Sequence, residues 1–289
     1  MGIVVVALSL AAALCFAAAS VLQHQAASAE PTGGMAGVRL LAHLLGRPRW
    51  LAGIVADGGG YLLQVLALDS GPLALVQPLL AGGLLFALIF NRSRQGRGMR
   101  APDWLAAAAI AGGLAIFVAV GAPRGSSRGL HAEGWAAFAM ITALAVAVTV
   151  TLAQRRGPAG RAALLAAGAG IAYGLSAALT KQTLGELHLG VGHAALTAYP
   201  YLLVVAGVGG MLLTQTAFQA GPLAASLPTL TLSEPVFATV AGVLLFSEHL
   251  RGGAAGALAL AGAAGAAAAV VGLTRSPSAQ PLPDPVPGA

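Results

Sequence analysis

Two acidic residues, Asp57 and Glu234, lie near the middle of long apolar stretches of the sequence. An ionised carboxylate inside a membrane is costly unless water or a partner compensates it, so such a residue indicates a pathway for ions or solutes. Both side chains can bind a cation or carry a coupling proton, and they are the metal-ligand candidates if the solute is a metal ion. The competing interpretation is a carboxyl group that only joins two helices.

The stretch that carries Asp57 also carries Tyr61 and Gln64, at spacings of four and three residues that place all three side chains on one face of an α-helix. Three consecutive glycines, 58–60, follow Asp57 directly and permit close helix packing or local unwinding. We expect these side chains to face one substrate or coupling-ion site. Weaker candidates for the same site, which could equally bridge helices through neutral polar groups, are Gln77, Gln215 and Tyr173.

Glu234 lies in an unusually polar part of its apolar stretch, with Thr231 one helical turn before it and Pro235 directly after it. Pro235 cannot donate the hydrogen bond that the carbonyl group of residue 231 would accept in a helix. Pro78 and Pro228 are predicted to break helices in the same way. Such breaks are tolerated in a membrane only beside protein or a water-filled cavity, which favours a site near Glu234. A Glu that only caps or stabilises a kink is the competing interpretation.

The overall composition is that of a polytopic membrane protein. Of the 289 residues, 57% are hydrophobic and only 8% are charged, whereas a water-soluble domain carries about 25% charged residues. Apolar runs near the roughly 20 residues that cross a bilayer predict nine spans: 2–22, 50–68, 72–90, 104–121, 135–153, 162–180, 197–218, 222–246 and 253–273. A tenth run, 35–46, is either a helix in the membrane interface or a shortened span. We therefore expect an all-α membrane helix bundle of nine or ten helices.

The remaining chemistry-bearing residues exclude several other classes of protein. Cys15 is the single cysteine and the six histidines lack metal-ligand spacing, so we expect no disulfide, no metal and no other cofactor. No phosphate-binding loop and no nucleophile–histidine–acid set occurs in the sequence, so we expect neither an ATP-driven pump nor an enzyme.

The charged residues between the spans predict how the chain lies in the membrane. The net charge of +6 comes largely from arginines in short gaps on one side of the spans. This asymmetry predicts a cell-membrane protein with a cytoplasmic C-terminus and no nucleic-acid partner. At two span ends, Lys181 is expected to be a solvated anchor and Glu248 to lie among the lipid headgroups.

The sequence also contains an internal repeat. Gly-Pro-Leu-Ala at 71–74 recurs at 221–224, 150 positions later, and a proline follows each copy at the same distance. Upstream, Leu-Gln-His-Gln at 22–25 resembles Leu-Thr-Lys-Gln at 179–182. An odd number of helices from the start of the first half to the start of the second half reverses the second half in the membrane, so we expect inverted transmembrane repeats at 1–121 and 161–273. A linking helix and loops are expected at 122–160, and a disordered Pro-rich tail is expected at 274–289. Two ordinary hairpin turns are the competing interpretation.

Several short motifs resemble those of a known superfamily of transporters. The letters LQVLAL at 63–68, GPL at 71–73 and LVQPL at 75–79 are similar to the second and third spans of the drug/metabolite transporter superfamily. YGLS at 173–176, EP at 234–235 and FSE at 246–248 also fit its patterns. Within the superfamily, the chain is most similar to the branch that contains NIPA-type magnesium transporters. The resemblance implies inverted halves around a central pathway, without fixing one substrate.

These observations lead to one predicted function and two alternatives. We predict a secondary transporter that moves a small solute by alternating access through a midplane cavity, with proton coupling through Asp57 or Glu234. The first alternative is a magnesium transporter of NIPA type, and the second is a non-transporting membrane scaffold or lipid-handling subunit. The expected partners are the lipid bilayer, a small-molecule or ion substrate and, in a homodimer, a second copy of the chain.

Overall fold

A computed structural model describes residues 2–27, 29–30, 38–83, 85–86, 90, 101, 104–105, 108–109, 112–113, 116, 132–221, 223–248 and 252–275. All of the regular structure in these residues is helical. The helices are α1 (Gly2–Ala27), α2 (Val38–Leu44), α3 (Pro48–Ser70), α4 (Leu73–Ala81), α7 (Ala132–Ala153), α8 (Pro158–Leu187), α9 (Val191–Leu196), α10 (Tyr199–Ala220), α11 (Leu223–Phe246) and α12 (Gly253–Arg275). The predicted all-α fold is therefore confirmed.

Within the described residues, six helices are long and apolar enough to cross a membrane. They are Ile3–Ala27, Pro48–Ser70, Gly134–Ala153, Pro158–Leu187, Tyr199–Ala220 and Ala225–Phe246. Each coincides with a predicted span, and the last predicted span, 253–273, forms α12. The predicted spans 72–90 and 104–121 lie partly outside the described residues, as the tail 274–289 largely does, so the total of nine or ten helices stays a prediction.

The described part of the tenth run forms a short helix at one end of the bundle. Helix α2 has seven residues, which at 1.5 Å per residue gives a length of about 10 Å, too short to cross a membrane. Leu40 and Leu44 are fully buried in a cluster with Trp50 and Phe218. This segment is therefore held against the ends of longer helices.

The three prolines predicted to break helices all lie inside helices of the structure. Pro78 lies within α4, and Pro228 and Pro235 lie within a continuous α11. A proline removes one backbone hydrogen bond, the one to the carbonyl group four positions before it. In α11, Pro228 and Pro235 therefore leave the carbonyl groups of residues 224 and 231 without their helical donor. The expectation of a broken helix is wrong at Pro228 and Pro235, although these prolines still weaken the local backbone hydrogen bonding. At Pro78 it stays a prediction, because α4 ends three residues later, at Ala81, and residues 84 and 87–89 lie outside the described residues.

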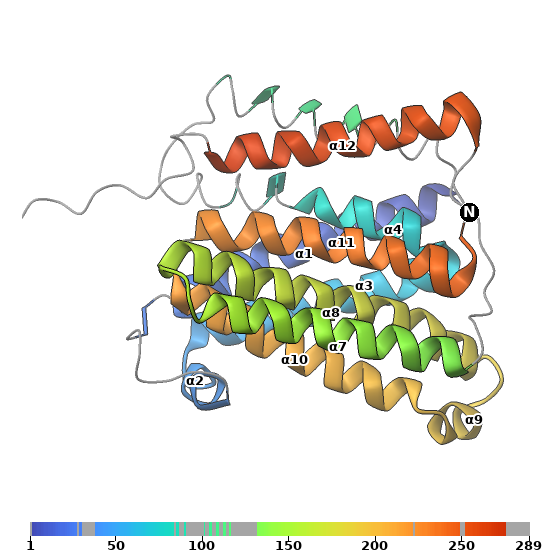
Figure 1. Ribbon diagram of the computed structural model, residues 1–289, viewed down its shortest axis with the longest axis horizontal. Coiled ribbons are helices and arrows are strands. Elements are labelled where there is room, and N and C mark those ends of the chain that lie inside the picture. Colours follow the sequence, from blue (N-terminus) through green and yellow to red (C-terminus); the bar gives the residue numbers. More distant parts are fainter. Residues whose placement is uncertain are drawn as a thin grey trace, which may run out of the picture.

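Six of the helices in the described ranges form two groups of three with the same pattern of neighbours. Helix α1 packs against α3 and α4, and α8 packs against α10 and α11. Helix α7 lies along α8, and α12 lies along one side of the bundle next to α11 (Figure 1). Contacts between α4 and α11 and between α1 and α10 join the two groups.

The two groups run in opposite directions. Figure 1 shows α2 at one end of the bundle, where α1 ends and α3 begins. Helix α9 lies at the other end, where α8 ends and α10 begins. Helices α1 and α8 are therefore antiparallel to each other, as are α3 and α10.

Close contacts in the first group recur in the second at shifted positions. A residue on α1 corresponds to the residue of α8 that lies 157 positions later, and its neighbour corresponds to the residue that lies 150 positions later. The matching pairs of neighbours are Val5–Gly71 and Ala162–Gly221, Phe16–Gly60 and Tyr173–Gly210, and Ala13–Gly83 and Gly170–Ser233. A β-carbon added at Gly60 would lie 2.9 Å from the Phe16 ring, and one added at Gly210 would lie 2.7 Å from the Tyr173 ring. At these positions the two groups are packed alike.

Candidate functional site

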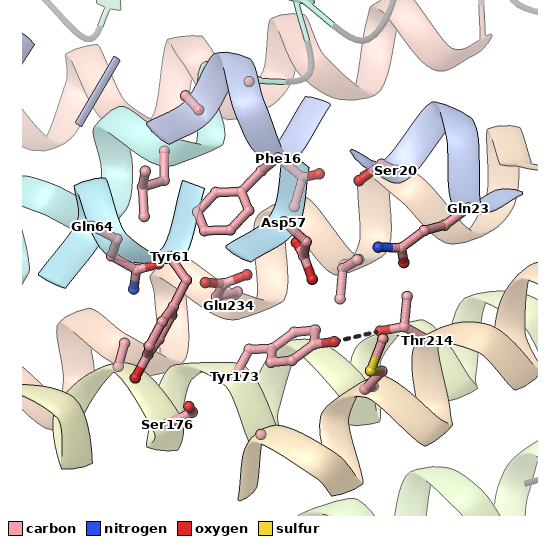
Figure 2. A pocket seen from close by; sticks show the side chains of 18 of the residues that line it. Phe16, Ser20, Gln23, Asp57, Tyr61, Gln64, Tyr173, Ser176, Thr214 and Glu234 are labelled. Carbon is pink, nitrogen blue, oxygen red and sulfur yellow. Dashed lines mark hydrogen bonds between the residues drawn. The ribbon is translucent and has the colours of Figure 1, made fainter. Parts of the chain in front are cut away.

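A cavity of about 680 Å³ lies inside the bundle, between α1, α3, α4, α8, α10 and α11 (Figure 2). Most of the residues that the sequence singles out line this cavity: Asp57, Tyr61, Gln64, Gln77, Tyr173, Thr231, Glu234 and Pro235. They come from four helices, so the fold brings together positions that are far apart in the chain. Their role in binding a solute stays a prediction.

The two carboxyl groups and a phenol face the same space from three helices. Figure 2 shows Asp57 from α3, Glu234 from α11 and Tyr173 from α8 directed into the cavity. The helical spacing of Asp57, Tyr61 and Gln64 places all three on the cavity side of α3. Glycine at position 210 lets the Tyr173 ring lie directly against α10.

The cavity has an acidic lining without a compensating base. Among the described lining residues, Asp57 and Glu234 are the ionisable acids, and no Lys, Arg or His is present. Phe16, Tyr61 and Tyr173 add aromatic surface to the lining, and aromatic rings attract cations through their quadrupole. No group of three or more His, Cys, Asp or Glu side chains in the described ranges is arranged to hold a metal ion. The site is therefore suited to a positively charged solute with apolar parts.

A chain of hydrogen bonds leads from Trp50, at the helix ends near α2, to Gln23 in the wall of the cavity. The indole N–H of Trp50 donates to Gln215 Oε1 at 3.3 Å, and Gln215 Nε2 donates to Gln23 Oε1 at 2.6 Å. Gln23 also lines the cavity, and its amide nitrogen lies on the side of the Asp57 carboxylate (Figure 2). Gln215, which the sequence predicts as a site residue, therefore does not line the cavity, because its amide group is engaged by Trp50 and Gln23.

Tyr61 connects α3 to α8 at the edge of the cavity. Its hydroxyl oxygen lies 2.9 Å from the Thr180 Oγ1 atom. The Thr180 hydroxyl group already donates its proton to the carbonyl oxygen of Ser176 at 2.8 Å, so Tyr61 must be the donor to Thr180. The phenol is thereby fixed in one orientation at the rim.

Gln77 brings an unpaired amide group to the cavity. Its side chain is fully buried, it lines the cavity, and neither amide atom has a hydrogen-bond partner among the described residues. A buried amide without a partner costs about 1–3 kcal/mol. A polar group of a bound solute can supply the missing hydrogen bonds, so Gln77 is a further candidate contact.

Comparison with known proteins adds one relative and no function. An uncharacterized protein of Corynebacterium glutamicum is 27% identical to this chain over 244 residues, which are 84% of each chain. No protein-family model and no solved structure matches the sequence. The function must therefore be inferred from the cavity.

Several cavity residues were missed at the level of the sequence. Phe16, Ser20, Gln23, Ser176 and Thr214 all line the cavity. Thr214 lies 3.4 Å from the Tyr173 hydroxyl group, to which it donates. Small polar residues are common on helix faces that contact other helices, so their types alone gave no signal. Gln23 lies in the repeated segment 22–25, which the sequence marks as part of the repeat and not as part of the site.

A buried ion pair lies at the end of the bundle opposite α2. Lys181 donates to Glu248, whose carboxylate oxygens also accept the backbone N–H groups of Leu73 at 2.9 Å and Ala74 at 2.8 Å. The Lys181 ammonium group lies 5.0 Å from the centre of the Phe246 ring. The Glu248 side chain is fully buried and that of Lys181 is 10% exposed.

The expected solvated positions of Lys181 and Glu248 are therefore wrong. The carboxylate is compensated by a cation and by the first amide groups of α4, where the helix dipole also favours a negative charge. Because α4 belongs to one group of helices and Lys181 to the other, the pair ties the two groups together at this end.

Proposed function

We propose that the protein is a secondary transporter of the drug/metabolite type, which moves a small cationic organic solute through the central cavity by alternating access. The observation that carries the proposal is the pair of carboxyl groups, Asp57 and Glu234, which come from opposite groups of helices and face one cavity that has no basic lining residue among those described. A carboxylate in such a place is expected to bind a cation or a coupling proton.

We infer that the two groups of helices are inverted repeats. Their antiparallel directions (Figure 1) and the contacts that recur at constant shifts support this inference. A further correspondence lies at the two ends of the bundle: His43 Nε2 is 3.0 Å from a Glu30 carboxylate oxygen, and His193 Nε2 is 2.9 Å from one of Glu186. His43 and His193 are again 150 positions apart. Inverted repeats around a midplane site are the architecture by which many secondary transporters alternate access.

The basic residues favour an orientation in the cell membrane. Arg47 and Arg49 lie at the α2 end of the bundle, where α8 also begins, so that Arg155, Arg156 and Arg161 lie at the same end. Arginines gather on the cytoplasmic side of membrane proteins. We propose that the α2 end is cytoplasmic, together with the end of α12 at Arg275.

The size and lining of the cavity favour an organic solute over a bare metal ion. A volume of about 680 Å³ lies within the range of roughly 300–1,000 Å³ that is typical of small-molecule sites. Magnesium prefers a compact octahedral shell of oxygen ligands, and two carboxylates in an otherwise largely apolar lining supply little of it. A magnesium transporter of NIPA type is the competing proposal, since the same two carboxylates would be its ligands.

Uptake into proteoliposomes tests the proposal. Purified protein is reconstituted and offered magnesium, neutral amino acids and tetramethylammonium-type organic cations, each with and without a pH gradient. We expect uptake of organic cations that responds to the pH gradient, in the manner of proton exchange. Uptake of magnesium alone would replace our proposal with the competing one, and no uptake of any of these solutes would favour a scaffold.

A further inference from the structure

Helices α3 and α10 line the cavity from opposite sides but scarcely touch each other. They are bridged near one end, where the Trp50 indole donates to Gln215. Eleven residues further along α3, Tyr61 is hydrogen-bonded to Thr180 of α8 instead of α10. At 1.5 Å per residue the two bridges are about 16 Å apart along the helix. Between them the wall of the cavity has a gap.

Residues at this gap face both the cavity and the outside of the bundle. Val204 and Val208 line the cavity, yet they are 62% and 51% exposed. Gly58 of α3 also lines the cavity and is exposed. A β-carbon added at Gly58 would meet no atom within 4 Å. The cavity is therefore open sideways between these residues.

The opening lies at the depth of the lipid tails. Gly58 is close to the middle of α3 (Pro48–Ser70), and Val208 is close to the middle of α10 (Tyr199–Ala220). Both helices are long and apolar enough to span a membrane. A gap at mid-span faces hydrocarbon, where only an apolar group is stable. The charged wall of the cavity, in contrast, begins one residue away, at Asp57.

We propose that the cavity binds a cation with an apolar tail and receives it from the bilayer, through the opening between α3 and α10. The cationic head lies between Asp57 and Glu234, and the tail lies in the opening beside Gly58, Val204 and Val208. A tail that enters sideways stays in an apolar surrounding throughout, so only the head group changes its environment. This inference rests on the proposed function and narrows its substrate class.

Four glycines provide blocking variants and matched controls. Gly58 and Gly207 line the cavity on the two sides of the opening, and a β-carbon at Gly207 would have Ser176 Oγ as its nearest neighbour, at 3.9 Å. Gly59 and Gly209 lie one and two positions away on the same helices, also have open space within 4 Å, and do not line the cavity. A β-carbon therefore fits at all four positions without a close contact.

The test compares two cations that share a head group, dodecyltrimethylammonium and tetramethylammonium. Their affinities for the protein are measured in lipid nanodiscs, with binding to empty nanodiscs subtracted. We expect Gly58→Leu and Gly207→Leu to lower the ratio of the two affinities, long tail over short, by about ten-fold. Gly59→Leu and Gly209→Leu should leave this ratio as in the unmodified protein.

The possible results separate this inference from the proposed function. An affinity ratio that is the same in all four variants would overturn the proposal that the cation enters through the opening and binds there. A change of oligomeric mass in Gly58→Leu or Gly207→Leu would also overturn it, because a second copy of the chain would then cover this face. If neither cation bound in a manner that depends on Asp57, the proposed function itself would fail.

Discussion

The double variant Asp57→Asn, Glu234→Gln is expected to take up organic cations at no more than about one hundredth of the normal rate, since each lost charge–charge attraction is worth roughly 1–4 kcal/mol and 1.4 kcal/mol is a factor of ten. Asn and Gln keep the shape of the side chains, so the volume of the cavity is preserved. Initial uptake rates in proteoliposomes, corrected for the amount of inserted protein, measure the effect.

A matched control lies on the same helix as Asp57. Asp69, near the end of α3, pairs with His188 at 3.2 Å, and both side chains are well exposed. Asp69→Asn also removes one acidic charge, but this charge lies outside the cavity. The variant should therefore take up organic cations at the normal rate. A loss of uptake in Asp69→Asn as large as that in the double variant would mean that general surface charge, and not the cavity, drives cation uptake.

Glu248→Ala is expected to lower the free energy of unfolding by about 3–5 kcal/mol, the usual cost of removing one partner of a buried ion pair. The substitution leaves the buried Lys181 ammonium group without its counter-charge, and it leaves the amide groups of Leu73 and Ala74 without their acceptor. Thermal unfolding of the purified protein in detergent measures the loss as a lower melting temperature.

Two further variants separate the ion pair from a general effect of charge removal. Asp69→Asn breaks an exposed pair and should cost less than about 1 kcal/mol. Lys181→Met removes the buried cation, so Glu248→Ala should cost less in that background than alone. A melting temperature of Glu248→Ala equal to that of Asp69→Asn would show that the pair does not tie the two groups of helices together.

The part of the site that helical periodicity determines could be predicted from the sequence. Asp57, Tyr61 and Gln64 share one face of α3 because of their spacing alone, and Thr231 and Glu234 share one face of α11 for the same reason. The cost of a charge in an apolar surrounding then indicated which face is functional. All five residues line the cavity.

The part that depends on contacts between distant helices could not be predicted. Gln215 is as polar as Gln77, but only the packing of α1 against α10 shows that it binds Gln23 instead of facing the cavity. Glu248 lies 67 positions from Lys181, and nothing in the spacing reveals that the first amide groups of α4 meet its carboxylate. The polar partners of each residue are a property of the tertiary fold.

The central claim, an acidic cavity that admits cations, can be tested by the reactivity of a single cysteine. Ser176 lines the cavity, and Cys15 is the single native cysteine, so Ser176→Cys in a Cys15→Ser background gives one reporter thiol. Its rates of reaction with a cationic and an anionic methanethiosulfonate of similar size are compared. We predict that the cationic reagent reacts at least about ten-fold faster, and that Asp57→Asn with Glu234→Gln removes the difference. Equal rates for the two reagents, or a thiol that reacts with neither, would contradict the account.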